Sequence, residues 1–415
     1  MNRSKKMNNC RLCDSNKLIK IIDFGKVPLG NNLTHSKKSS NNADIFDLCL
    51  IRCSSCKHFQ LNYEVSPDKL YATNYTYLSG VAPSFIKHFD SYSKWIIKKC
   101  DLKSKHTVLD IGSNDGTCLN SFKKRNINVL GIDPAQLPAK IANKKGIKTL
   151  NKFFNKESSN KIKKQYGQMD FITSHNVLAH IGNITEVFEN IFNLLKYKGY
   201  FCFEVGYFLK VLENNYFDTI YHEHLDYHHA SPLTKYLINL GFSVVNITTN
   251  NVQGGTLRVL CKKNIKARLY AQPKNFLTKE NNSIINNKVF LKKWPNAIND
   301  NMYQLNQITK KYIRQKKIII GYGAPTKATL ILKMSNIKKN IVSSIIEDND
   351  LKVGKYMPKT DIKIVKYSKN EINASDVIII FAWNFFSDIV KKLKKEKISK
   401  KIIIVPLPKV RIFYL

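Results

Sequence analysis

Acidic residues are scarce in this chain of 415 residues, because 30 Asp and Glu stand against 68 Lys and Arg and leave a formal net charge of +38. Such an excess is typical of nucleic-acid-binding proteins. The basic residues, however, are scattered in twos and threes, and the sequence carries no RNA- or DNA-binding signature. We therefore expect a solvated basic surface and no nucleic-acid partner, although a basic cleft would help to attract a diphosphate substrate.

Long apolar runs are also missing. No run approaches the roughly 20 residues that a membrane-spanning helix needs, and the stretch VIIIFAW at 377–383 has the length of a core strand. The first residues, MNRSKKMNNCRLC, are charged but lack the apolar segment of a signal peptide. Nine cysteines without such a signal favour a reducing compartment. These absences predict a cytoplasmic protein without a membrane partner, and the length predicts two or three domains.

One glycine is missing from a loop whose sequence is otherwise typical of nucleotide-binding loops. Residues 108–116 read VLDIGSNDG, an apolar run that predicts a buried parallel strand followed by a tight turn. Asn114 stands where such loops usually carry another glycine, and Asn tolerates left-handed conformations better than most residues. The loop thus departs from G-x-G-x-x-G, which favours a cofactor without a pyrophosphate. S-adenosylmethionine (SAM), an adenosine with a sulfonium and an amino acid, fits this description.

A second predicted strand, at 128–132, ends in Asp133. The spacing from the glycine loop suits a carboxylate that accepts both ribose hydroxyls of a bound nucleoside. A third predicted strand, at 170–174, is followed by HNVLAHI at 175–181, and ligands of doubly wound sheets bind at that carboxyl end. The candidate cofactor-binding residues are Asp110, Gly112, Ser113, Asn114, Gly116, Asp133 and Asn176.

Two C-x2-C pairs, Cys10 with Cys13 and Cys53 with Cys56, offer four thiolates in an arrangement typical of tetrahedral structural zinc. The gap between the pairs is longer than in common zinc ribbons, so the segment between them must form a small sub-structure. Two unrelated buried pairs are the alternative. A redox C-x-x-C is less favoured, because neither pair opens a helix after a strand.

The stretch YHEHLDYHH at 221–229 concentrates four of the ten histidines. It allows three interpretations: a metal site, a solvated polar turn or a cluster of catalytic bases. The metal interpretation lacks the helical H-E-x-x-H geometry.

From 274 to 301 the chain is rich in Asn and Lys, which predicts a polar linker with an exposed helix.

The last part of the chain begins again with a predicted strand at 317–320. The loop GYGAPTK at 321–327, a helix at 328–334 and a strand at 342–346 ending in Glu347 follow. By itself this pattern could be half of an NAD-binding fold. Thr326 and Lys327 also offer a hydroxyl and an ammonium where a diphosphate could lie at a helix N-terminus.

Together, these motifs resemble the three-domain SAM-dependent C-methyltransferases that act on nucleotide-linked keto sugars. The matching motifs are DIGSNDG, the two C-x2-C pairs, DFGKVPLGNNL at 23–33, Y-x-Y-x-S-G at 75–80, YHEH at 221–224, GGTLR at 254–258, GYGAPTK and AWN at 382–384. The resemblance covers nearly the whole chain. It implies an α/β protein in which a Rossmann-like class I methyltransferase domain at 76–285 is flanked by a small zinc-binding domain at 1–75 and a C-terminal Rossmann-like domain at 286–415. The last domain is expected to contribute to nucleotide-sugar binding.

The resemblance also implies roles for individual residues. His224, the second histidine of the YHEH motif, is expected to be the catalytic base, His180 to face the active site and Tyr75 to line the sugar pocket. The candidate catalytic residues are His224, Tyr221, Glu223, His180 and Tyr75, and the candidate substrate-binding residues are Tyr77, Ser79, Ala324, Thr326 and Lys327.

The predicted reaction is C-methylation beside the ketone of a nucleotide-linked 4-keto sugar, with SAM as methyl donor and zinc in a structural role. The carbon next to a ketone has an acidic proton, and its removal gives an enolate that attacks the methyl group. An NAD(P)-dependent nucleotide-sugar oxidoreductase is the alternative, and a zinc-bearing binding protein is a weaker one. We expect a monomer or a weak homodimer.

Overall fold

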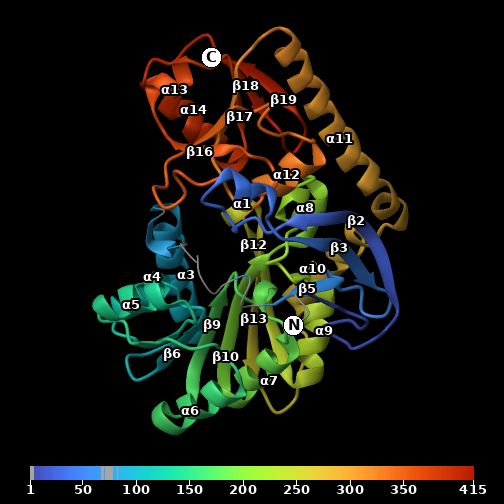
Figure 1. The fold of residues 1–415 in the computed structure, drawn as a ribbon. Coiled ribbons are helices and arrows are strands. Elements are labelled where there is room, and N and C mark those ends of the chain that lie inside the picture. The colour runs from blue at the N-terminus through green and yellow to red at the C-terminus, as the bar shows by residue number, and fades with distance from the viewer. Residues whose placement is uncertain (1–3, 67–69, 71–77, 82) are drawn as a thin grey trace.

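The computed structural model describes residues 4–66, 70, 78–81 and 83–415. The predicted site residues Tyr75 and Tyr77 lie outside this part. Three parts of the chain each build a β-sheet, coloured blue, cyan to yellow, and orange to red along the chain in Figure 1. Within the described residues, no helix is both long and apolar enough to cross a bilayer.

The N-terminal part is an antiparallel sheet of β2 (Leu18–Pro28), β3 (Ile45–Cys53) and β4 (Phe59–Leu61). Its fourth strand, β11 (Asp226–Tyr227), comes from the middle of the chain and pairs with β4. The smaller elements are β1 (Ser4–Lys6), paired with β5 (Tyr63–Val65), and α1 (Lys37–Asn41). The sub-structure predicted between the two cysteine pairs is therefore this sheet.

The central part is a seven-stranded sheet in the order β12-β13-β10-β9-β6-β7-β8. Its strands are β6 (Thr107–Ile111), β7 (Asn128–Ile132), β8 (Thr149–Leu150), β9 (Met169–His175), β10 (Leu195–Gly206), β12 (Phe242–Asn250) and β13 (Thr256–Lys263). The pairs from β8 to β10 are parallel, and β13 is antiparallel to both of its neighbours. This is the class I methyltransferase topology that the resemblance predicted.

The helices of this part connect its strands. They are α3 (Pro83–Cys100), α4 (Thr117–Lys123), α5 (Gln136–Lys144), α6 (Lys156–Tyr166), α7 (Ile184–Leu194), α8 (Phe208–Glu213) and α9 (Ala230–Leu240). The expected strand at 128–132 is confirmed residue for residue, and its buried Leu130 and Ile132 show why an apolar run predicts a core strand. Because parallel strands end at the same edge, their following loops meet there and form the ligand site.

The C-terminal part is a six-stranded sheet in the order β16-β15-β14-β17-β18-β19. Its strands are β14 (Ile319–Tyr322), β15 (Ser344–Glu347), β16 (Lys363–Lys366), β17 (Val377–Ile380), β18 (Ile402–Val405) and β19 (Arg411–Tyr414). The first five strands in that order are parallel, and β19 is antiparallel to β18. Its helices are α12 (Ala328–Met334), α13 (Lys369–Asn373) and α14 (Phe386–Lys395), and the expected helix at 328–334 is confirmed.

The prediction of a polar linker at 274–301 is wrong. The segment belongs to α10 (Ala271–Asn281) and α11 (Lys288–Arg314), and α11 buries Leu291, Trp294 and Ile298 on one face. The polar residues that dominate the composition occupy the outer face, so composition concealed an amphipathic helix. Glu280 of α10 is also buried, where it accepts hydrogen bonds from the backbone amides of Ala230 and Ser231.

The three parts share one hydrophobic core, which contains residues from all three sheets. The N-terminal strand β2 contacts α11 and α12 of the C-terminal part (Figure 1). Thr34 and Tyr356 exchange two backbone hydrogen bonds of 3.1 and 2.8 Å. The loops that could hold a substrate are therefore fixed against one another by packing and by backbone pairing.

Candidate active site

Four cysteine sulfurs converge at the end of the N-terminal sheet. The Sγ atoms of Cys10 and Cys56 lie 3.6 Å apart, and so do those of Cys13 and Cys53. The four sulfurs lie within 4.8 Å of one another. A tetrahedral zinc with Zn–S bonds of about 2.3 Å requires sulfurs separated by roughly 3.8 Å. The residues therefore fit a structural zinc ion with four thiolate ligands and no open position.

The loop after β6 adopts the conformation that its sequence predicted. Gly112, Asn114 and Gly116 all have positive φ, at 71°, 51° and 76°. A Cβ atom on Gly112 would lie 2.2 Å from Cγ2 of Val177, so the close approach of the two loops requires glycine. The loop thus presents its backbone at the carboxyl edge of the sheet.

Asp133 holds this loop in place from the end of β7. Its carboxylate accepts hydrogen bonds of 2.8 Å from the backbone amides of Asn114 and Ala135, and burial raises its pKa. Ser79 and Gly80 contact the same loop, since their amides donate to the side chains of Asn114 and Asp115.

Two further predicted cofactor residues, at the end of β6 and in this loop, have buried polar side chains. Asp110 Oδ1 and Ser113 Oγ are buried without a hydrogen-bond partner in the described part of the chain, and burial raises the pKa of Asp110 well above its usual range. Asn176, directly after β9, also has a positive φ of 55°. Polar atoms buried without partners beside a glycine-rich turn suit the hydroxyl and amino groups of a nucleoside cofactor such as SAM.

His224 and Tyr221 form a hydrogen-bonded pair above the sheet. The Nδ1 atom of His224 donates to the carbonyl oxygen of Thr219 at 3.0 Å, which leaves Nε2 to accept from the Tyr221 hydroxyl at 2.9 Å. Burial lowers the pKa of His224 to about 3, so the ring is neutral and its lone pair is on Nε2. The rings of His180 and His224 meet edge to face at 4.8 Å, and Nδ1 of His180 donates to the carbonyl oxygen of Glu223 at 2.7 Å. The structure therefore brings the predicted His180, Tyr221, Glu223 and His224 together.

The other polar residues of this stretch are buried, which contradicts the solvated-turn interpretation. His222, His228 and His229 have exposed fractions of 2%, 1% and 0%. Burial lowers the pKa of His222 and of His228 to about 4. His229 bonds Glu280 at 3.2 Å and the carbonyl of Lys57 at 3.1 Å, so its side chain joins the N-terminal part to the later parts of the chain.

Asn31 is a site residue that sequence reasoning missed. Its amide nitrogen donates to both carboxylate oxygens of Glu223, at 2.8 and 2.9 Å, and its amide oxygen accepts from the hydroxyl of Thr326. The motif DFGKVPLGNNL that contains Asn31 was recognised in the sequence, but nothing in it pointed to a contact so distant along the chain. Burial raises the pKa of Glu223 to about 7, so its protonation changes near neutral pH.

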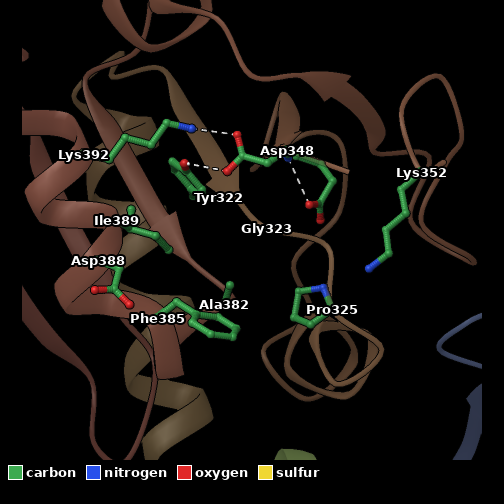
Figure 2. Close-up of a pocket in the computed structure, with 11 residues that line it drawn as sticks. Tyr322, Gly323, Pro325, Asp348, Lys352, Ala382, Phe385, Asp388, Ile389 and Lys392 are labelled. Carbon is green, nitrogen blue, oxygen red and sulfur yellow. Dashed lines mark hydrogen bonds and ion pairs between the residues drawn. The ribbon is translucent and has the colours of Figure 1, made fainter. Parts of the chain in front are cut away.

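The C-terminal sheet has a cavity of about 340 Å³ at its carboxyl edge (Figure 2). Carboxylates of Glu347, Asp348 and Asp388 line it, together with the ammonium groups of Lys352 and Lys392. Asp348 accepts from Lys392 at 2.7 Å and from Tyr322 at 3.2 Å, as the dashed lines of Figure 2 show.

The predicted loop residues lie beside this cavity. Ala324 donates its backbone amide to Glu347 at 2.8 Å, and Thr326 faces Asn31. Lys327 is held elsewhere, since its Nζ lies 3.9 Å from the ring centroid of Trp383 and 4.0 Å from Oδ2 of Asp218. Asp218 is fully buried and also accepts from the Trp383 indole at 2.6 Å. Sequence reasoning missed Asp218, and the lysine charge is therefore already balanced inside the fold.

A second histidine cluster lies at the carboxyl edge of the central sheet. Glu204 of β10 binds His88 at 2.7 Å, His175 at 3.1 Å and Arg258 at 2.6 Å. Burial alone raises the pKa of Glu204, but the hydrogen bonds from the two histidines hold it well below its usual range. Because Arg258 already neutralises the carboxylate, we interpret the cluster as a network that joins α3 to the sheet.

Three family models match successive parts of the chain. They are described as "Putative zinc binding domain" at residues 10–71, "Methyltransferase domain" at 86–247 and "C-methyltransferase C-terminal domain" at 251–408. A curated relative, C-methyltransferase NovU of Streptomyces niveus, is 27% identical over 408 residues, which span 98% of this chain and 97% of the relative. The chain is a SAM-dependent C-methyltransferase, with successive matches to a zinc-binding, a methyltransferase and a C-terminal C-methyltransferase domain. Its cofactors are SAM and zinc, and the oxidoreductase and binding-protein alternatives are set aside.

Solved methyltransferase structures align with less than half of the chain. Magnesium protoporphyrin IX methyltransferase from Synechocystis, with bound SAM, aligns at a TM-score of 0.34 and 13% identity over 43% of this chain and 79% of that chain. A SAM-dependent methyltransferase from Clostridium acetobutylicum aligns at 0.35 and 16% identity over 42% of this chain and 92% of that chain.

Proposed function

We propose that this C-methyltransferase methylates the carbon beside the ketone of a nucleotide-linked 4-keto sugar, and that His224 removes the proton. The observation that carries the proposal is the state of His224. Its Nδ1–H donates to Thr219, and burial keeps the ring neutral, so the lone pair of the ring is on Nε2, where it accepts from Tyr221. A general base must be unprotonated, with its lone pair within reach of the proton that it removes.

The reaction needs the C–H bond beside the ketone to break, with its electron pair moving into an enolate and its proton moving to Nε2 of His224. The one lone pair of Nε2 accepts from Tyr221, so the tyrosine hydroxyl must turn away from Nε2 before the proton can move there. The turned hydroxyl can donate to the ketone oxygen, where negative charge develops as the enolate forms. We propose this exchange of hydrogen bonds as the role of Tyr221, with His180 as the residue that packs against the base.

SAM supplies an electrophilic methyl group when it is bound. We propose that Asp133 accepts its ribose hydroxyls and that the loop residues Asp110, Gly112, Ser113, Asn114 and Gly116, with Asn176, surround the rest. Asp133 and the loop form one unit through the hydrogen bond to Asn114. Such a fixed arrangement aligns the methyl donor with the enolate, which is a proximity effect.

We propose that the nucleotide part of the substrate binds in the cavity of the C-terminal sheet. Carboxylates suit the hydroxyls of a ribose, and Lys352 and Lys392 supply positive charge beside them. The loop that borders this cavity carries Ala324, Thr326 and Lys327, and we propose that these residues contribute to substrate binding. Ser79, with Tyr75 and Tyr77, is proposed for the sugar, because its amide contacts the SAM loop at Asn114.

The division into domains at 1–75, 76–285 and 286–415 is likewise a proposal. The match to the C-terminal family model begins at residue 251, yet β13 (Thr256–Lys263) belongs to the central sheet. Sheet membership therefore favours the later boundary.

The experiment is an assay with labelled SAM and a panel of nucleotide-linked 4-keto sugars. We expect methyl transfer to at least one of them, and nuclear magnetic resonance of the product should place the new methyl group on the carbon beside the ketone. Free 4-keto sugars without the nucleotide are the matched control and should react far more slowly. Transfer to oxygen or nitrogen, or equal rates with free sugars, would contradict the proposal.

A further inference from the structure

Asn31 lies where the three parts of the chain meet. It belongs to the loop after β2, Glu223 to the central part and Thr326 to the loop before α12. The amide nitrogen of Asn31 faces both oxygens of Glu223, and the amide oxygen faces the Thr326 hydroxyl, as suits an ionised carboxylate that only accepts hydrogen bonds. One side chain therefore joins the C-terminal loop to the catalytic motif with a defined direction of hydrogen bonding.

The two loops fit without spare room. A Cβ atom at Gly30 would lie 2.3 Å from the carbonyl oxygen of Thr326 and 2.6 Å from its Cγ2. The backbone next to Asn31 is therefore in direct contact with Thr326. A shift of the loop at 323–327 must move Asn31 or break its hydrogen bond.

On its other side, Asn31 acts on the base. The carbonyl oxygen of Glu223 accepts from Nδ1 of His180, and the ring of His180 packs against His224. Glu223 thus connects Asn31 to both histidines through its side chain and its backbone.

The loop at 323–327 also borders the C-terminal cavity. Gly323, Pro325 and Lys352 line the cavity (Figure 2). Lys352 also donates to the carbonyl oxygen of Ala324 at 2.9 Å. An occupant of the cavity therefore contacts the same loop that presents Thr326.

We infer that Asn31 is a positioning residue that couples occupancy of the C-terminal cavity to the catalytic pair: a nucleotide that fixes the loop at 323–327 fixes Thr326, Asn31 and Glu223 in turn. The substrate assays below rest on the proposed function, since they use its nucleotide-linked keto sugar. The coupling makes proton removal efficient when the nucleotide is in place and suppresses it otherwise.

The charge on Glu223 gives a readout that a purely structural role would not move. Burial raises the pKa of Glu223, and the Asn31 amide opposes this effect by stabilising the carboxylate. Removal of Asn31 should raise this pKa further, whereas loss of the Thr326 hydroxyl leaves the amide donors in place.

The experiment compares Asn31→Ala, Thr326→Val, the double variant and the exposed control Asn32→Ala. The rate of deuterium wash-in beside the ketone, without SAM and at saturating substrate, reports proton removal alone. Asn31→Ala should slow wash-in by roughly 10- to 100-fold, the effect of losing a hydrogen bond to a charged group. Thr326→Val should slow it less, and the double variant should match Asn31→Ala because both residues act in one chain of contacts.

Three further measurements complete the test. The pH dependence of wash-in should move to higher pH in Asn31→Ala and stay in place in Thr326→Val. Thr326→Ser keeps the hydroxyl and should restore the wild-type rate. Affinity for S-adenosylhomocysteine should stay unchanged in all variants, which shows that the fold is intact. Additive effects in the double variant, or an Asn31→Ala enzyme that behaves like Asn32→Ala, would overturn the inference.

A ligand-free measurement separates this inference from the proposed function. Hydrogen–deuterium exchange of the Ala328 and Thr329 amides, which bond to Pro325 and Thr326, reports how firmly the loop is held. Asn31→Ala should accelerate their exchange relative to Asn32→Ala, whether or not any keto sugar is a substrate. Equal exchange would overturn the inference, whereas an inactive wild type would overturn the proposed substrate alone.

Discussion

Asp226 pairs with Gln60 across two antiparallel strands, and the carboxylate of Asp226 bonds Nε2 of His58 at 2.8 Å. His58 and Gln60 lie two and four residues after Cys56, and Asp226 lies two residues after the YHEH motif. One small sheet therefore joins the metal site to the segment that carries the YHEH motif.

Loss of zinc should lower turnover as well as stability. Replacing Cys53 and Cys56 with Ser should reduce the zinc content from one ion per chain. It should also unfold β3 and β4, because the free energy of metal binding supplies much of the folding free energy of so small a sheet. The strand β11, which follows the YHEH motif, then loses its partner β4. We expect turnover to fall while affinity for S-adenosylhomocysteine, measured by calorimetry, changes little.

The matched control for this prediction is Cys49→Ser, since Cys49 is buried in the same sheet but is not one of the four clustered sulfurs. This variant should keep its zinc. A zinc-free Cys53→Ser, Cys56→Ser protein with full activity would show that the sheet holds without metal.

Replacement of the base should separate binding from chemistry. His224→Asn should lower turnover by about 10²–10⁴, the usual contribution of a positioned acid–base group, and leave the affinity for S-adenosylhomocysteine unchanged. Deuterium wash-in beside the ketone should be lost together with methylation. The exposed His35→Asn is the control. Wash-in that survives while methylation fails would assign the base to another residue and leave His224 to align the methyl donor.

Removal of the carboxylate at the end of β7 should weaken cofactor binding. Asp133→Ala removes the proposed ribose acceptor and also the acceptor of the Asn114 amide, so the loop loses its support. We expect a loss of about 1.5–3 kcal/mol in SAM affinity, the value of a hydrogen bond to a charged group. Asp101→Ala, at an exposed position, should bind normally. Unchanged affinity in Asp133→Ala would place the ribose elsewhere.

Buried histidines should make the protein sensitive to acid. Burial lowers the pKa of His228 in the folded state to about 4, whereas an unfolded histidine titrates near 6.5. The unfolded chain therefore binds more protons between these values, and stability is lost as the pH falls from about 6.5 toward 4. Each such group contributes up to about 1.4 kcal/mol per pH unit. Glu223, whose pKa is raised to about 7, acts in the opposite direction because its contribution is lost as the pH rises toward 7.

His228→Phe tests this pH dependence. Neither ring nitrogen of His228 makes a hydrogen bond within the described part of the chain, so a phenyl ring of similar size should be tolerated. Urea unfolding at several pH values should show a shallower loss of stability below pH 6.5 in the variant, with His35→Phe as the exposed control. An unchanged slope would mean that His228 is protonated in the folded state.

Much of the fold could be predicted from local patterns. An apolar run located β7 to the residue, because burial in a parallel sheet imposes such a run directly on the sequence, and the apolar segment after the GYGAPTK loop located the helix α12. The left-handed Asn114 and the paired cysteines were equally local, since backbone conformation and metal spacing act over a few residues. The interpretation of 274–301 as a linker failed because an amphipathic helix with one buried face has a polar average composition.

The sequence by itself determined which chemical groups are present and which local turns hold them: the four thiolates, the glycine loop with its acid and the clustered histidines. Only the tertiary structure decided how they act. It placed the lone pair of His224 on Nε2 through Thr219, joined Asn31 to Glu223 and Thr326, and balanced Lys327 with Asp218. Such contacts join residues far apart in the chain, and burial sets the charge of each group, so no local pattern encodes them.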